Sequence, residues 1–357
     1  MVHFPRTFPA IAILAALVSF LDARAEPDLA KEVLADGVVL FRTPSALDLW
    51  TATNVVAVVG DEDVTVFDAN TRPATTRRVI AAIRKMTDKP VRTLIDSHWH
   101  MDHWSGNAEY RKAFPGVRIV ATTATRDYLK RMGHGLFADF AGGGVARARE
   151  ELEKATGLTD EERRQKERDI ADSAALAKEM AEVPHVLPDV AFAGSLTLWS
   201  GDRELRLLTM TGDATGSAVL YLPAERILVT GDVLVSPEDG NGPPPWTTNS
   251  YAITPWLESL RGLDALDAKV IVPGQGPAQH DETYLKRTID LYAAILDQVH
   301  AALERGLFKL EEVQAAVNVD EIGKGYTPGV APGEPFHRWV STLTKKAYQE
   351  SLDGVMR

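Results

Sequence analysis

The chain has 357 residues, of which 45% are hydrophobic and 25% are charged, and its formal net charge is -11 at pH 7. These values are typical of a soluble globular protein with a sizeable core, long enough for about two domains. They argue against a nucleic-acid partner, because phosphate binding needs a basic surface. Since there is no cysteine, disulfide bonds and thiolate metal ligands are excluded, and nitrogen and oxygen donors remain.

The first 25 residues have the three parts of a secretory signal peptide. A weakly basic start precedes an apolar segment from Phe8 to Leu21, and small residues follow at Ala23 and Ala25, as at a cleavage site. The apolar segment is shorter than the about 20 residues of a membrane span, although an uncleaved anchor stays an alternative. We predict a signal peptide at residues 1–25 and a periplasmic protein, with secretion as the alternative and no stable membrane insertion after cleavage.

Short β-branched runs separated by turn residues predict strands at residues 37–41, 54–59, 64–68 and 91–96. Between the last two, apolar residues at helical spacing predict a crossover helix over residues 72–86. A meander of strands followed by a crossover helix indicates a layered α/β fold. Ligand sites in such folds favour the C-terminal ends of strands.

A dense cluster of metal-ligand residue types follows the strand at residues 91–96, and it holds three of the nine histidines of the chain. Histidines at i and i+2 project to the same side of an extended segment. His98 and His100 can therefore face one metal ion, while a turn after them brings Asp102 and His103 round. The alternative is a solvated, histidine-rich loop, but this density of ligand types after a strand favours a metal site.

Residues 145–182 differ in character, because they are rich in Ala, Glu, Lys and Arg. They predict one or two solvated helices broken near Gly157, where Thr159 and Glu162 have the spacing of a capping box. We predict a helical insertion that covers the core. The alternative is a lid over the metal site, with Gly142–Gly144 as its hinge.

Strands return after the insertion, and the last part of the chain is helical. Strands are predicted at residues 190–192, 195–199, 204–210, 217–222, 226–230 and 269–272, and a helix at residues 255–263. From Asp281 onward, helical periodicity continues to the C-terminus with one Gly/Pro-rich break. This tail either covers the core or mediates dimerisation, so the oligomeric state stays open.

The order of four motifs resembles the metallo-β-lactamase superfamily. The motifs are Ser97–His103, Gly212–Gly216 before Tyr221-Leu222-Pro223, Leu228–Asp232 and Val272–Pro277. The resemblance implies an α/β fold, an αββα sandwich with a metal site at one edge, usually binuclear zinc and usually hydrolytic. We therefore predict a metallo-β-lactamase-like domain over residues 26–280, which contains the helical insertion, and a helical C-terminal extension over residues 281–357.

The resemblance also implies a role for each residue of the motifs. His98 and His100 would bind the first metal, Asp102 and His103 the second, and Asp232 would bridge the two. Without the first motif, Asp232 could equally be a residue of a Gly-Asp turn that closes a strand.

Two positions depart from the family pattern. Asp213 stands where the family has its third histidine, and Gln275 stands where it has a late Gly-His-Gly histidine. A carboxylate is used beside histidines in catalytic zinc sites, so Asp213 is a predicted ligand of the first metal, with a loop residue as the alternative. Added carboxylates favour iron or manganese relative to zinc. Gln275 offers only a neutral oxygen, so the second metal is expected to bind less tightly or not at all.

Other residues are weaker candidates for the site. The histidines nearest in sequence that could replace the missing ligand are His134, His185 and His280, each of them expected to be a surface or lid residue. Aromatic candidates for the walls of the site's mouth, or alternatively for core packing, are Trp99, Trp104, Trp246 and Tyr251.

The predicted function is that of a metal-dependent hydrolase. One or two zinc ions, with iron or manganese as alternatives, would activate water to cleave a small ester, amide, lactam or thioester. Asp102 and Asp232 would be catalytic residues that hold the nucleophile and carry its proton. The alternative is a member of the fold with impaired hydrolysis that binds a ligand or partner through the same cleft. The fold alone does not identify the small-molecule substrate.

Overall fold

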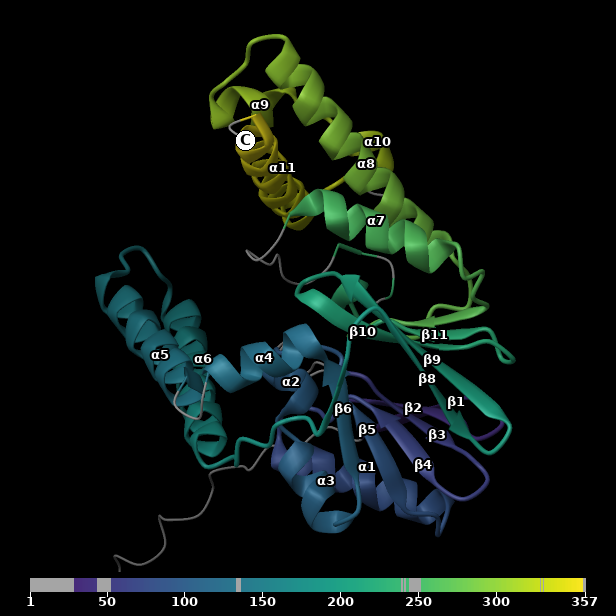
Figure 1. The fold of residues 1–357 in the computed structure, drawn as a ribbon. Coiled ribbons are helices and arrows are strands. Elements are labelled where there is room, and N and C mark those ends of the chain that lie inside the picture. The colour runs from purple at the N-terminus through teal and green to yellow at the C-terminus, as the bar shows by residue number, and fades with distance from the viewer. Residues whose placement is uncertain are drawn as a thin grey trace, which may run out of the picture.

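The computed structural model describes residues 29–43, 53–132, 136–238, 240, 242–243, 252–327, 329 and 331–355. The predicted signal peptide lies outside the described residues. The described residues form two sheets that face each other, with helices on their outer faces (Figure 1). The predicted αββα sandwich is therefore confirmed. None of the helices in the described ranges is long and apolar enough to cross a membrane.

The first sheet has seven strands in the order β1-β2-β3-β4-β5-β6-β7. Its first four strands pair antiparallel and its last four pair parallel. The carboxyl ends of β4 and β5 therefore meet at one edge, where the histidine-rich motif begins. The strands are β1 (Ala30–Ala35), β2 (Val38–Arg42), β3 (Val55–Val59), β4 (Val64–Phe67), β5 (Val91–Ile95), β6 (Arg118–Thr122) and β7 (Val190–Phe192).

The second sheet has five strands in the order β12-β11-β10-β9-β8. Its neighbours pair antiparallel except β11 and β12, which are parallel. The ends of β9 and β11 carry the turns that hold Asp213 and Asp232. The strands are β8 (Ser195–Ser200), β9 (Arg203–Thr211), β10 (Thr215–Leu222), β11 (Ile227–Val229) and β12 (Val270–Val272).

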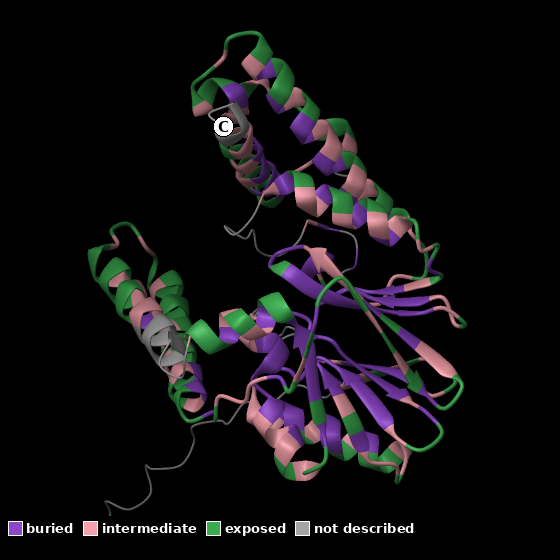
Figure 2. Cartoon of the chain, in the orientation of Figure 1, coloured by how far each residue is buried: buried purple, intermediate pink, exposed green. Residues whose placement is uncertain are grey.

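The core consists of three apolar layers, and burial is concentrated on the sheets (Figure 2). The layer between the sheets includes Phe67, Ile95 and Leu220. On the outer face of the first sheet, α1 (Pro73–Met86) and α3 (Asn107–Ala113) pack Ile83 and Tyr110 against the strands. Central strands that are covered on both faces, such as β2 and β3, are therefore nearly continuous apolar runs, whereas β1 and β8 alternate between exposed and less exposed residues.

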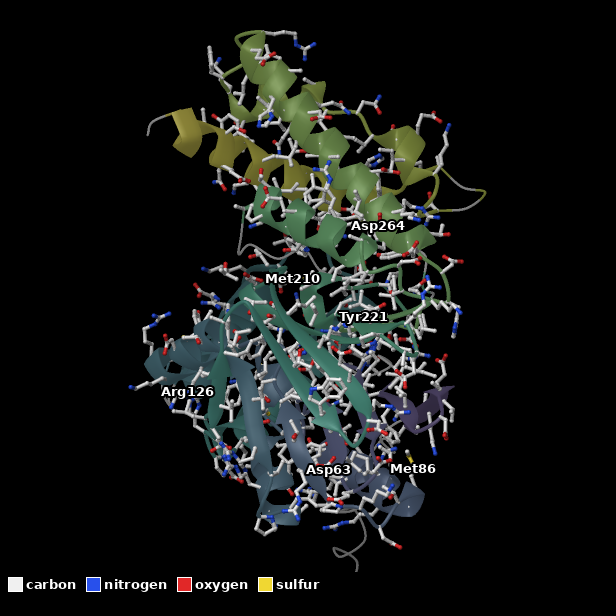
Figure 3. The ribbon with its side chains drawn as sticks, turned by 45° about the vertical axis from the view of Figure 1, so that its right-hand side comes forward. Asp63, Met86, Arg126, Met210, Tyr221 and Asp264 are labelled. Atoms are coloured by element: carbon white, nitrogen blue, oxygen red, sulfur yellow. The ribbon has the colours of Figure 1, made fainter. Side chains whose placement is uncertain are left out.

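The C-terminal helices cover the outer face of the second sheet. Their largest members are α7 (Ile253–Asp264), α8 (Thr283–Glu304) and α11 (Glu334–Val355), with the short helices α9 (Leu310–Ala316) and α10 (Asp320–Gly323) between the last two. Met210, Tyr221 and Asp264 mark the boundary between this sheet and α7 in Figure 3. The Tyr221 hydroxyl donates a hydrogen bond to the Leu266 carbonyl at 3.0 Å. Of the two predicted roles of the tail, the structure shows the covering of the core.

The predicted insertion forms a pair of helices, α5 (Leu136–Lys154) and α6 (Asp160–Ala181), which follow α4 (Thr123–Met132). The predicted capping box is confirmed, since Thr159 and Glu162 exchange backbone and side-chain hydrogen bonds at the start of α6. The predicted hinge is wrong, because Gly142–Gly144 lie inside α5. Helix α5, which pairs with α6, continues through these glycines despite their low helix propensity.

Candidate metal centre

The histidine-rich motif is held at the edge of the first sheet, directly after β5. His98 and His100 lie in the loop that leaves the strand, and the one-turn helix α2 (Met101–Trp104) carries Asp102 and His103. Asp213 lies between β9 and β10. Asp232 lies in the 3-10 turn η2 (Gly231–Val233) after β11. The two halves of the sandwich thus contribute their strand ends to one place.

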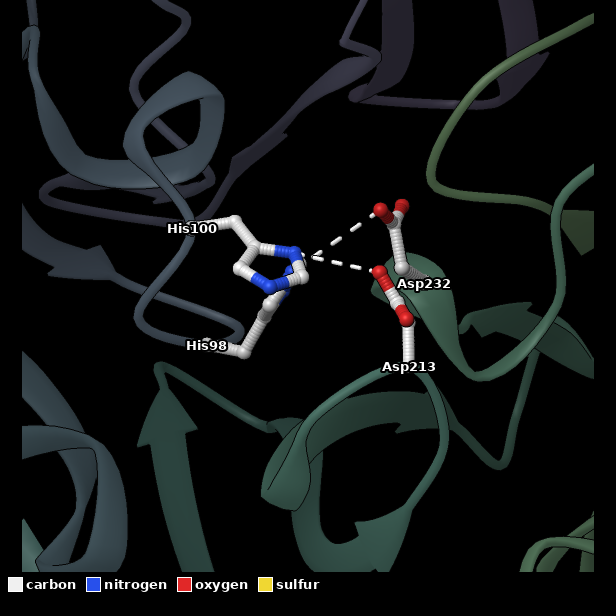
Figure 4. A group of neighbouring side chains, drawn as sticks. All are labelled: His98, His100, Asp213 and Asp232. Atoms are coloured by element: carbon white, nitrogen blue, oxygen red, sulfur yellow. Dashed lines mark ion pairs between the residues drawn. The ribbon is translucent and has the colours of Figure 1, made fainter. Parts of the chain in front are cut away.

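Four of the predicted ligand residues form one group, in which the donor atoms of His98, His100, Asp213 and Asp232 all lie within 4.8 Å of one another. His100 Nδ1 lies 3.2 Å from Asp213 Oδ2, and His98 Nε2 lies 3.8 Å from Asp232 Oδ2. Figure 4 shows the two imidazoles facing the two carboxylates. Two nitrogen and two oxygen donors at this spacing suit zinc, iron or manganese.

The atoms of this group fit a cation because several are buried without a hydrogen-bond partner in the described residues. Within the described residues, His98 Nε2, Asp213 Oδ1 and Asp232 Oδ1 are buried and have no hydrogen bond. Buried polar atoms are rarely left so. Gly274 keeps the space open, since a Cβ there would lie 2.0 Å from Asp232 Oδ1.

Asp102, His103 and Asp232 form a second group. His103 Nε2 lies 3.0 Å from Asp102 Oδ2 and 3.5 Å from Asp232 Oδ1. Asp232 therefore belongs to both groups, which is the bridging place that the family resemblance implies. Gln275 Nε2 donates a hydrogen bond to Asp102 Oδ2 at 3.0 Å, so its amide binds the carboxylate of this group.

Asp68 and Ser97, to which the sequence analysis gave no role, orient the histidines. Asp68 Oδ2 lies 2.7 Å from His103 Nδ1, and Asp68 Oδ1 accepts the backbone N–H of Ser97 at 2.8 Å. Ser97 Oγ lies 3.0 Å from His98 Nδ1. With each Nδ1 held in this way, the Nε2 atoms of both rings face the site, an arrangement that is typical of metal-binding histidines.

Asp68 could have been found from the predicted sheet, but not from the motif itself. Asp68 ends an apolar strand, has a left-handed φ of 64° and lies beside the carboxyl end of β5. The parallel pairing of β4 and β5 would have pointed to it. Strained backbone of this kind is frequent at functional sites.

Burial and the neighbouring charges set the protonation of the site. Burial, and then the charges of His103 and His100, hold the pKa of His98 well below its ordinary value, so its imidazole is a neutral donor. Burial raises the pKa of Asp232 to about 6, against the effect of His103. Burial would lower the pKa of His103, but the surrounding Asp102, Asp68 and Asp232 raise it well above its ordinary value.

The pKa values of the other two motif residues follow the same rules. Burial would lower the pKa of His100, but the hydrogen bond and charge of Asp213 raise it. Burial would raise the pKa of Asp102, but His103 and Thr53 hold it below its ordinary value. The imidazoles of His100 and His103 and the carboxylates of Asp213 and Asp102 thus stabilise each other's charged forms in a buried site.

Among the weaker candidates that the structure describes, His185 and His280 belong to neither donor group. His280 forms a surface ion pair with Glu32 at 3.0 Å, and His185 packs against the Trp104 ring. Trp104 is buried in the core, whereas Trp99 is half-buried and touches the His100 ring. His134, Trp246 and Tyr251 lie outside the described side chains.

Comparison with known proteins shows that this chain is similar to one family profile, to alkylsulfatases and to metallo-beta-lactamases. A family profile described as "Metallo-beta-lactamase superfamily" matches residues 48–275. The chain is 28% identical over 275 residues to a linear primary-alkylsulfatase from Pseudomonas sp. (strain ATCC 19151), a match that covers 75% of this chain and 50% of that protein.

Solved structures share the fold. The stereoselective inverting sec-alkylsulfatase Pisa1 from Pseudomonas sp. aligns with a TM-score of 0.59 and 17% identity, over 91% of this chain and 50% of that chain. A metallo-beta-lactamase from Pontibacter korlensis aligns with a TM-score of 0.50 and 20% identity, over 74% of this chain and 99% of that chain. The chain spans about half the length of both alkylsulfatases.

Proposed function

Because the chain belongs to the metallo-β-lactamase superfamily, we propose that it is a metal-dependent hydrolase. The observation that carries the proposal is the group of four donors, His98, His100, Asp213 and Asp232, whose buried atoms converge within 4.8 Å. These residues would hold the first ion. A divalent ion bound there would lower the pKa of a coordinated water toward about 7 and polarise the bond to be cleaved.

The protein's own groups would then prepare the site for hydrolysis. Ser97 and Asp68 fix the imidazoles of His98 and His103 through their Nδ1 atoms. Asp102 and Asp232 are the carboxylates that would hold the attacking water and carry its proton to the leaving group. The low exposure of the donors removes competing water and strengthens each electrostatic contact.

We propose an alkyl sulfate as the first substrate to test among the small esters. The sequence likeness to the linear primary-alkylsulfatase supports this choice. Carboxylic esters, amides, lactams and thioesters are the other classes that the predicted chemistry includes. Zinc is the first metal to test, followed by iron and manganese, since the carboxylate-rich donor set suits all three.

A second candidate function is ligand binding without efficient hydrolysis. Gln275 favours it, because an amide occupies a place where the family pattern has a histidine, and its Nε2 binds Asp102. A centre that holds its second ion weakly would bind substrate and turn it over slowly.

Activity assays on reconstituted protein test the proposal. Metal-free protein would be loaded with zinc, iron or manganese and assayed with an alkyl sulfate, a carboxylic ester, a lactam and a phosphodiester. We expect hydrolysis of one ester class that disappears with a chelator and in His98→Ala, while the surface variant His280→Ala keeps wild-type activity. Hydrolysis that persists in His98→Ala would contradict the proposal, and binding without turnover would favour the second candidate.

A further inference from the structure

One of the three motif histidines lacks the polar partner that orients the other two. Ser97 and Asp68 hold two of the imidazoles at their Nδ1 atoms. His100 instead turns its own Nδ1 toward Asp213, at 3.2 Å from Oδ2, as Figure 4 shows. In the part of the chain that the structure describes, no hydrogen bond holds its other nitrogen, Nε2. Because rotation about the bond to an imidazole ring is soft, another contact must keep this Nδ1 in place.

The ring of Trp99 makes that contact. The centroids of the Trp99 and His100 rings lie 4.2 Å apart and their planes meet at 79°, an edge arrangement that aromatic rings favour. The His98 ring also meets the His100 ring at an edge, with 4.5 Å between centroids. The His100 side chain is 23% exposed, compared with 0% for His98, so fewer neighbours confine it. The indole is therefore a large part of what surrounds this ligand.

Trp99 is itself fixed at two points. Its ring stacks on the ring of Tyr128 in α4, with 3.9 Å between centroids and 23° between planes. Its backbone carbonyl accepts a hydrogen bond from Nε1 of the buried Trp104 at 2.9 Å. The guanidinium group of Arg131, also in α4, lies 5.9 Å from the centroid of the Tyr128 ring. A change in the position of the indole would therefore disturb its stack with α4.

Helix α4 also contacts the segment that carries Asp213. Thr122, directly before the helix, donates a hydrogen bond from its Oγ1 to the carbonyl of Gly216, at the start of β10. A Cβ at Gly216 would lie 2.5 Å from the Cβ of Ala124, so the glycine lets α4 approach the strand closely. Helix α4 thus connects the segment of Asp213 to the indole that contacts His100.

We propose that Trp99 and Tyr128 are positioning residues of the first metal, and that their stack holds the His100 imidazole with Nδ1 toward the ion that Asp213 also binds. An aromatic pair then does for His100 what polar partners do for the other two histidines. This rests on the proposed function and deepens it, because it concerns the ion that the proposed hydrolysis requires.

Zinc affinity tests the positioning role without turnover, by competition between metal-free protein and a chromophoric chelator. Loss of a residue that orients a ligand costs about 10- to 100-fold in metal affinity, so we expect this loss in Trp99→Ala and a smaller loss in Tyr128→Ala. The variants that keep a ring, Trp99→Phe and Tyr128→Phe, should retain most of the affinity. Trp199→Ala removes an exposed indole in β8 and is the matched control, with the affinity of wild type.

Protein loaded with cobalt(II) gives a second readout, which a loss of stability alone would not change. The visible absorption of cobalt(II) depends on the geometry of its donors. We expect the bands to shift in Trp99→Ala and to return toward those of wild type in Trp99→Phe. If Trp99→Ala does not fold, Tyr128→Ala provides the comparison, because Tyr128 is only half-buried on α4.

Four results would overturn the inference. They are wild-type zinc affinity with an unchanged cobalt spectrum in the alanine variants, an equal loss of affinity in Trp99→Ala and Trp199→Ala, an equal loss in Tyr128→Ala and Tyr128→Phe, and wild-type protein that binds neither metal. Wild type that shows the expected pattern of zinc affinities but hydrolyses no ester would instead contradict the proposed function and support the positioning role.

Discussion

At the scale of single residues, the second metal position is short of one ligand. Asp102 Oδ2 accepts hydrogen bonds from Thr53 Oγ1 at 2.7 Å and from Gln275 Nε2 at 3.0 Å. These donors stabilise the carboxylate in the absence of a cation. Only His103 and Asp232 complete this group, and Asp232 is shared with the first. The centre should therefore bind one ion well and a second ion poorly.

Restoring a histidine at this position should restore the second ion. An imidazole is a much better zinc ligand than a neutral amide oxygen, so Gln275→His should raise bound zinc from about one to about two ions per chain. Zinc titration of metal-free protein, followed by elemental analysis, measures this. Gln279→His, a nearby change at a residue outside both donor groups, is the matched control and should leave the count at one. If Gln275→His also binds one ion, the missing ligand is not the reason for the weak second position.

A buried acid beside the site should make stability depend on pH. Asp96 is fully buried, and its Oδ2 accepts a hydrogen bond from Asn107 Nδ2 at 2.8 Å. Burial raises the pKa of Asp96 well above 3.8. As the pH rises from about 4, the unfolded chain therefore loses this proton before the folded chain, and the free energy of unfolding falls by about 1.4 kcal/mol per unit of pKa shift.

Asp96→Asn removes this dependence, because an amide keeps the hydrogen bond to Asn107 without ionising. The variant should match wild type near pH 4 and be more stable at pH 8. Urea unfolding of both metal-free proteins at the two pH values measures the difference. A variant that is equally destabilised at both values would show that Asp96 is ionised in the folded protein.

The sequence predicted six residues that converge at the site. It did not predict Asp68, because the prediction relied mainly on residues that lie close together in the sequence. His98, His100, Asp102 and His103 lie within one short motif, and their spacing shows that they can share a site. Asp68 lies about 30 positions earlier, and only the pairing of β4 with β5 brings it to His103. The spacing of residues in one motif therefore identifies metal ligands more easily than it identifies residues of other strands that orient those ligands.

At the scale of elements, α7 connects the outer helices to both turns that carry the site's carboxylates. Trp256 donates to Val233 O next to Asp232, and its ring packs against Tyr292. Helix α7 therefore contacts the two turns that hold Asp213 and Asp232, although it lies on the outer face of the second sheet. Helix bounds were predicted well where apolar spacing was regular, as in residues 72–86. The glycine triplet was wrongly predicted as a hinge, because low local propensity did not interrupt α5.

Trp256→Phe should loosen the turn that carries Asp232. The ring remains, but the Val233 carbonyl loses its donor, and an unpaired buried carbonyl costs about 1–3 kcal/mol. We expect a lower melting temperature, measured by thermal unfolding, and several-fold weaker zinc binding, measured by zinc titration. Trp199→Phe, at an exposed position in β8, should change neither. Zinc binding at wild-type strength in Trp256→Phe would mean that α7 does not position Asp232.

At the scale of the whole molecule, the two helical additions differ in how they join the sandwich. The C-terminal helices share a buried cluster with the second sheet, which includes Leu228, Leu291 and Trp339. Among the side chains that the structure describes, Leu176 and Met180 of α6 and Val183 after it form a small buried cluster against Met101. Figure 2 shows the pair as mostly exposed. Amphipathic periodicity predicted both as helices, but which apolar face meets which sheet depends on tertiary packing that periodicity does not contain.

A charge placed in the core of the C-terminal helices should therefore prevent folding, whereas a charge on the exposed surface of α6 should not. Leu291 is 0% exposed in α8, and Leu291→Asp places an unpaired charge in the core, at a cost of several kcal/mol. We expect no soluble folded protein from this variant. Ala175→Asp, on the exposed side of α6, should express and melt like wild type. Soluble Leu291→Asp protein with wild-type stability would show that the C-terminal helices are dispensable for the fold.

The metal content of purified protein tests the central claim most directly. Elemental analysis after zinc loading and gel filtration should give about one tightly held ion per chain in wild type and in His280→Ala, and much less in Asp213→Ala, because a structural or catalytic zinc site needs its full donor set. Wild-type protein that retains no zinc, iron or manganese, or Asp213→Ala protein that retains as much as wild type, would contradict the assignment of this site.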